Sequence, residues 1–143
     1  MAPMELQNRA EYLSLALFAQ RTVQALMDYV DRGKTTKLRV SLQEALDSLL
    51  RAKDPSASSR PRVAAFASYE HLRTLEEVWD AGQRTQAIKK MRIILKAPQN
   101  PRAKVVANDL IGLFSNLQNQ ALWNFEQPQP VSQKVVQRLC QLV

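Results

Sequence analysis

The sequence predicts an all-α fold, a compact and mostly antiparallel bundle of about five to six helices. Apolar residues recur at helical spacing along most of the chain. Only three glycines occur, whereas alanine, leucine, glutamine, lysine and arginine, which favour helices, are plentiful. No stretch alternates between apolar and polar residues for long enough to predict a strand. Because 143 residues suit one domain, we expect residues 1–143 to form a single helical-bundle domain.

Two helices are predicted before the first break in the pattern. The first covers residues 5–31, and Gly33 follows it where a glycine commonly ends a helix. Thr35 or Thr36 can cap the second helix. The apolar stripe of the second helix consists of Leu38, Leu42, Ala45, Leu46 and Leu49. A flexible loop rich in serine and proline is then predicted near 54–62, because the apolar periodicity stops there.

The middle of the chain predicts a third and a fourth helix. The third covers residues 62–80, starting next to Pro61, since proline is tolerated at a first helical position. We expect Gly82 to end the third helix and the fourth helix to cover residues 83–96.

Two further helices, each preceded by a proline linker, complete the predicted bundle. The first linker lies near residues 97–101 and the second near 127–130. A fifth helix over residues 102–125 lies between them, with an apolar stripe of Val106, Leu110, Leu113, Leu117 and Ala121. The sixth helix is indicated by Val131, Val135, Leu139 and Leu142.

The residues that could carry catalysis are sparse, and we expect neither an enzyme nor a cofactor. His71 is the single histidine and Cys140 the single cysteine, which is too few for a zinc site of the usual composition. We interpret Cys140 as a packed core residue. An enzyme that uses Glu76, Asp80 and His71 remains an alternative, but the sequence shows no further ligands converging on them. Three scattered glycines exclude a glycine-rich phosphate loop.

The compartment is also predicted from what the sequence lacks. No run approaches about 18 apolar residues, so no membrane span is expected. The first residues show no basic segment followed by an apolar run, so no secretory signal is expected. A single thiol suits a reducing environment. We therefore expect a cytoplasmic protein that does not bind a membrane.

The distribution of charge is the strongest functional signal in the sequence. The formal net charge is +7. Residues 83–104 contain seven basic residues and no acidic one, so this segment alone carries a charge equal to the whole excess. Such a segment concentrates positive potential and attracts anionic partners.

Within this segment, the predicted fourth helix presents a row of cations. At 100° per residue, Lys89, Arg92 and Lys96 fall within about 60° of one another, beside an apolar arc. Lys90 lies on the other flank of that arc. Arg102 and Lys104 follow at the start of the fifth helix, where a cation opposes the helix dipole.

Two further basic clusters extend the candidate nucleic-acid-binding surface. One follows Gly33, and the other surrounds the loop rich in serine and proline. Their residues are Lys34, Lys37 and Arg39 in the first, and Arg51, Lys53, Arg60 and Arg62 in the second. Lysine and arginine on the helices of a bundle can neutralise phosphates, and we expect the contacts here to be to phosphates and not to base edges. We therefore predict a non-catalytic nucleic-acid-binding protein that contacts the phosphate backbone without reading sequence, with DNA and RNA both left open.

The alternative is a helical adaptor or chaperone that binds other proteins. In that case the basic face would dock on an acidic partner, and the fifth and sixth helices would supply the rest of the contact.

The chain resembles the small helical subunit of CRISPR interference effector complexes of the Cascade, Csm and Cmr types. The shared features are the size, the helical pattern, the lack of catalytic residues and basic clusters such as Lys89-Lys90-Met91-Arg92 and Arg102-Ala103-Lys104. The resemblance implies a subunit of an antiviral ribonucleoprotein, present in several copies beside other subunits. It also implies that the basic face holds a guide RNA–target duplex or a displaced single strand.

Overall fold

The computed structural model describes residues 4–53, 69–127 and 141, and five helices are found among them. They are α1 (Met4–Arg32), α2 (Thr36–Lys53), α3 (Tyr69–Val78), α4 (Ala81–Lys96) and α5 (Pro101–Glu126). No strand occurs in this part of the chain, which confirms the predicted all-α bundle. The predicted loop near 54–62, the start of the predicted third helix and all four residues that indicated a sixth helix lie outside the described residues.

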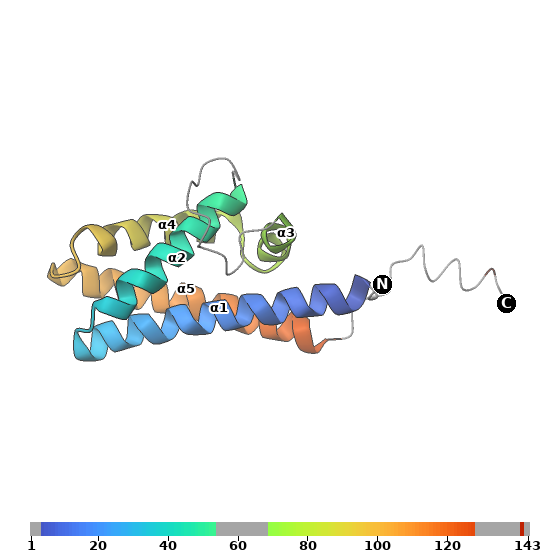
Figure 1. The fold of residues 1–143 in the computed structure, drawn as a ribbon, viewed down its shortest axis with the longest axis horizontal. Helices are drawn as coiled ribbons and strands as arrows, with labels where there is room; N and C mark the ends of the chain where they lie inside the picture. Colours follow the sequence, from blue (N-terminus) through green and yellow to red (C-terminus); the bar gives the residue numbers. More distant parts are fainter. Residues whose placement is uncertain (1–3, 54–68, 128–140, 142–143) are drawn as a thin grey trace.

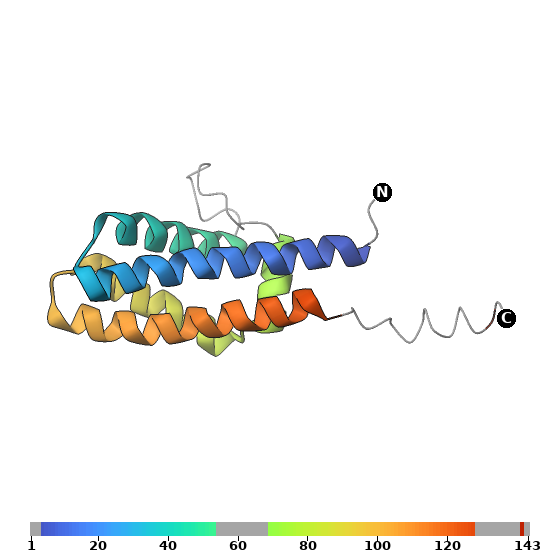
Figure 2. The ribbon, with the colours of Figure 1, turned by 90° about the horizontal axis from the view of Figure 1, so that it is seen from below.

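The long helices α1 and α5 form the base of the bundle. They run antiparallel and side by side along most of their length (Figures 1 and 2). The helices α2 and α4 pack next to each other on this base, α2 against α1 and α4 against α5. The short helix α3 contacts α1, α2 and α5 and lies across the bundle (Figure 1). None of the described helices is long and apolar enough to span a membrane.

The core is built from one apolar face of each helix. Phe114 of α5 is fully buried, and its ring centroid lies 5.2 Å from that of Trp79 and 6.2 Å from that of Phe18. The predicted stripe of α2 is buried along its whole length. On α5, four of the five predicted stripe residues are buried and Leu113 is half-buried. The apolar periodicity therefore identified the inward faces of both helices.

The turn between α1 and α2 lies at the same end of the bundle as the turn between α4 and α5 (Figures 1 and 2). Gly33 has a φ of 68° and its N–H donates to the Tyr29 carbonyl at 2.8 Å, which confirms that it ends α1. The Tyr29 hydroxyl donates a hydrogen bond to the carbonyl of Pro98, in the other turn. This bond ties together two turns that are far apart in the sequence.

The prediction that Gly82 separates α3 from α4 is wrong, because a capping box sets this boundary two residues earlier. The Asp80 carboxylate accepts a hydrogen bond from the Gln83 backbone N–H at 2.8 Å. The Gln83 side chain accepts one in return from the Asp80 N–H at 3.2 Å. Helix α3 therefore ends at Val78, and Gly82 lies in the first turn of α4.

Candidate nucleic-acid interface

The cationic row consists of Lys89, Arg92 and Lys96, which lie on one exposed face of α4. The opposite face of the helix is held in the core by Ala87, Met91 and Ile94. Intervals of three and four residues keep the cations on one side of an α-helix. Among the described residues, no acidic side chain forms an ion pair with any member of the row.

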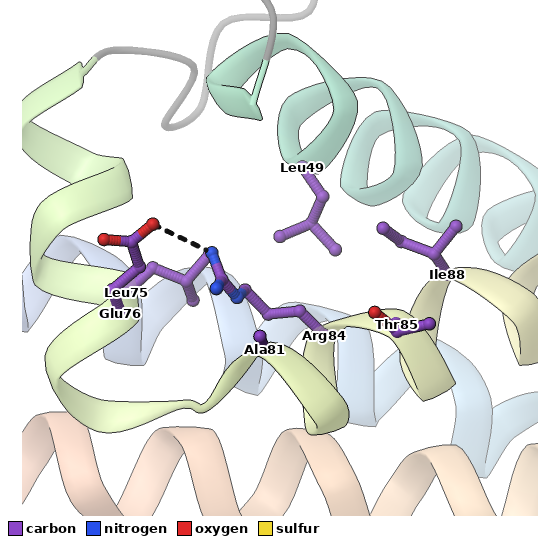
Figure 3. A pocket seen from close by; sticks show the side chains of 7 residues that line it. All are labelled: Leu49, Leu75, Glu76, Ala81, Arg84, Thr85 and Ile88. Carbon is purple, nitrogen blue, oxygen red and sulfur yellow. Dashed lines mark hydrogen bonds and ion pairs between the residues drawn. The ribbon is translucent and has the colours of Figure 1, made fainter.

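The acidic residues that precede α4 are engaged elsewhere. Glu76 pairs with Arg84, with 3.3 Å between Oε1 and Nη1 (Figure 3). Glu77 accepts a hydrogen bond from the Tyr12 hydroxyl of α1. Asp80 caps α4. The charge of the cationic row is therefore not cancelled by the three carboxylates nearest to it in the sequence.

Lys90 is directed away from the cationic row. It is half-buried, and its Nζ lies 3.4 Å from the Asp109 carboxylate of α5. The sequence placed Lys90 on the other flank of the apolar arc but could not identify its partner, which is 19 residues away. Its charge contributes to the contact between α4 and α5.

A groove with an apolar floor runs beside the cationic row. Its volume is about 490 Å³. The floor is formed by Leu50 of α2 with Ile88 and Ile93 of α4, and these three side chains are half-buried. The rim is formed by the cationic row and Thr85. The sequence did not predict this groove, because Leu50 joins it only through the packing of α2 against α4.

A second pocket continues the groove toward α3. It has a volume of about 310 Å³ and shares Thr85 and Ile88 with the groove (Figure 3). Its remaining lining residues are Leu49, Leu75, Glu76, Ala81 and Arg84. Arg84, in this pocket, is paired with Glu76, which neutralises its charge. The cations of the row have no ionic partner among the described residues.

The structure brings two of the predicted basic clusters to one end of the bundle, which we call the basic end. Lys34, Lys37 and Arg39 are exposed around the start of α2, and Arg102 and Lys104 are exposed in the first turns of α5. The two turns that carry them are joined by the hydrogen bond from Tyr29 to Pro98. Neither α2 nor α5 has an acidic residue in its first turn. At α5 the Arg102 N–H already donates to the Asn100 side chain at 3.0 Å, so the cations at these helix starts, rather than free N–H groups, favour an anion.

The last predicted cluster surrounds the loop near 54–62, and two of its four residues lie in the described part of the chain. Arg51 and Lys53 lie in the final turn of α2, and nothing is described of their side chains. Arg60 and Arg62 lie outside the described residues, as does Cys140. His71 lies in α3. Within the described part of the chain, no three His, Cys, Asp or Glu side chains are grouped to hold a metal ion.

Comparisons of the chain with protein-family models, with curated proteins and with solved structures identified no match. The features of the described residues that bear on function are the cationic row, the groove beside it and the basic end of the bundle.

Proposed function

We propose that this protein is a non-catalytic nucleic-acid-binding subunit of a ribonucleoprotein complex, and that it contacts phosphates without reading base edges. The observation that carries the proposal is the cationic row. Lys89, Arg92 and Lys96 are all exposed, and none has an ionic partner among the described residues. Exposed cations without partners are available to neutralise phosphates, and the release of counterions then favours binding.

The length of the cationic surface supports a chain-like anion as the ligand. Lys89 and Lys96 are separated by about 10 Å along the axis of α4, since each residue adds about 1.5 Å. Beyond Lys96 the surface continues onto the end of the bundle, where the cations of α2 and α5 lie. A single small anion would occupy only part of this surface, whereas successive phosphates of one strand would follow it.

The position of the cations on α2 and α5 gives further support. A positive side chain in the first turn of a helix opposes the helix dipole and lowers the stability of the helix slightly. Lys37 and Arg39 begin α2 in this way, as Arg102 and Lys104 begin α5. An anionic ligand at this end would offset the unfavourable placement at both helices.

A second candidate function is favoured by the apolar floor of the groove. An amphipathic helix of another protein could place apolar side chains on Leu50, Ile88 and Ile93 and acidic side chains on the rim. This would be the adaptor or chaperone function that the sequence left open. Both candidates use the same cations, so loss of binding on mutation of the cations does not separate them.

The test compares two charge reversals of the same size. Arg92→Glu removes a member of the cationic row, while Arg21→Glu changes an exposed arginine of α1 outside the row. We expect Arg92→Glu to weaken binding of an oligonucleotide by about tenfold or more, and Arg21→Glu, at a residue that lines a pocket with Lys37, to weaken it clearly less. Fluorescence anisotropy at low salt measures both affinities, and circular dichroism checks that helicity is retained.

The ligand itself separates the two candidate functions. The proposal expects DNA or RNA oligonucleotides to bind more tightly than polyglutamate of equal charge. Equal effects of Arg92→Glu and Arg21→Glu on oligonucleotide affinity would contradict the assignment of the cationic row. Tighter binding of polyglutamate would favour the acidic protein partner instead.

A further inference from the structure

We infer that the nucleic acid bound at this groove is single-stranded, with bases resting on the apolar floor and phosphates on the cationic rim. The inference rests on the proposed function and specifies the class of ligand that the site takes. It also adds a type of contact, because the floor touches the faces of bases rather than their hydrogen-bonding edges.

The first step of the argument is the arrangement of apolar and charged side chains around one opening. Leu50, Ile88 and Ile93 form the floor, and the three cations of the row stand on the rim of the same groove. Leu50, Ile88 and Ile93 pack against the core with part of their surface, and the part that stays exposed gives the groove an apolar floor beside the cations. Such a floor is stabilised by contact with a ligand that is apolar on one side.

The second step concerns which nucleic acid can present an apolar surface beside its phosphates. In a duplex, the faces of the bases are stacked on one another, and the outer surface consists of phosphates, sugars and the base edges in the grooves. In a single strand, unstacked bases can turn outward and place their faces on a protein surface while the phosphates follow a basic groove. The groove, at about 490 Å³, falls within the range of ligand pockets, about 300 to 1,000 Å³.

The third step concerns what the groove can recognise. Its seven lining residues are three aliphatic side chains, three cations and Thr85. Among the described residues that line the groove, Thr85 is the one uncharged side chain that can form hydrogen bonds, and the three cations are assigned to phosphates. We expect binding to tolerate sequence and to favour strands whose bases separate easily, such as runs of pyrimidines.

The test uses the unmodified protein and three ligands with the same number of phosphates. They are a single-stranded oligothymidylate, a single-stranded abasic oligomer and a DNA duplex. We expect the oligothymidylate to bind at least about fivefold more tightly than the abasic oligomer, because covering about 40 Å² of apolar surface at about 25 cal/mol per Å² contributes about 1 kcal/mol. We also expect it to bind more tightly than the duplex at the same salt concentration.

Two matched variants locate the base contact. Ile93→Thr makes the floor polar, whereas Ile111→Thr makes the same change at a half-buried isoleucine of α5 outside the groove. Ile93→Thr should remove most of the preference for oligothymidylate over the abasic oligomer and leave the affinity for the abasic oligomer unchanged. Ile111→Thr should preserve the preference. Circular dichroism melting curves of both variants report any loss of folding.

The outcomes distinguish this inference from the proposed function. Equal affinity for oligothymidylate and the abasic oligomer, or tighter binding of the duplex, would overturn the base contact and leave phosphate binding intact. A preference that survives in Ile93→Thr would also overturn it. No binding of any of the three ligands at low salt would instead overturn the proposed function.

Discussion

Tyr29 connects the two turns at the basic end of the bundle. Its side chain is 1% exposed, and its hydroxyl donates to the Pro98 carbonyl in the turn that follows Lys96. This bond keeps the turn between α1 and α2 next to the turn between α4 and α5 (Figures 1 and 2). Burial raises the pKa of the Tyr29 hydroxyl above its usual value, because ionisation would leave a charge in a poorly hydrated site.

The raised pKa of Tyr29 gives a prediction about alkaline conditions. The folded pKa lies above the unfolded value of about 10, so this tyrosine contributes stability that is complete below about pH 10 and is lost as the pH rises through the folded pKa. Tyr29→Phe should lower the free energy of unfolding by about 1 kcal/mol at neutral pH. It should also lower the steepness with which stability declines above about pH 10.

Urea denaturation of the wild type and of Tyr29→Phe at several pH values measures both effects. An equally steep alkaline decline in the two proteins would show that Tyr29 is not the group responsible.

Single residues also show what could be predicted about helix boundaries. Gly33 was predicted correctly, because a glycine with positive φ is a local feature that ends a helix. Gly82 was assigned wrongly, although Asp80 and Gln83 have the spacing of a capping box. A glycine does not by itself end a helix, and here the hydrogen bonds between Asp80 and Gln83 determine the boundary.

At the scale of one helix, α4 carries cations that form ion pairs and cations that have no ionic partner among the described residues. The row on its exposed face was predictable, because helical spacing alone fixes which residues share a face. The sequence could not predict the ion pair of Lys90 with Asp109 or the contribution of Leu50 to the groove. Both depend on which helices become neighbours of α4, and this is decided by packing between elements far apart in the sequence.

Lys89 and Lys90 provide a matched pair of variants on the same helix. Lys89→Gln removes a cation with no ionic partner among the described residues, whereas Lys90→Gln removes one paired with Asp109. We expect Lys89→Gln to weaken oligonucleotide binding and to lower the slope of log affinity against log salt by about 0.7 for a single strand. Lys90→Gln should leave that slope nearly unchanged and cost less than about 1 kcal/mol of stability.

Anisotropy titrations over a range of salt concentrations compare these two variants. The assignment of the row to phosphates fails if Lys90→Gln lowers the slope as much as Lys89→Gln does.

At the scale of the whole molecule, the charge is unevenly distributed along the chain. Residues 105–127, which include most of α5, carry Asp109 and Glu126 and no lysine or arginine. The cationic row and the basic end of the bundle lie on α4 and around the two turns. Residues 83–104 carry seven cations and no carboxylate, a charge equal to the net charge of +7, and a polyanion is attracted to this part of the chain. The excess of positive charge can be read from the sequence. Only the fold shows that the clusters at the starts of α2 and α5 lie at the same end of the bundle.

The central claim is that the cationic row binds the phosphates of a nucleic acid. Its most direct test is the affinity for a single-stranded oligonucleotide between about 50 and about 200 mM salt. The wild type is compared with the triple variant Lys89→Gln, Arg92→Gln and Lys96→Gln. With three phosphate contacts removed, the slope of log affinity against log salt should become shallower by about 2. Equal slopes for the wild type and the triple variant would contradict the claim.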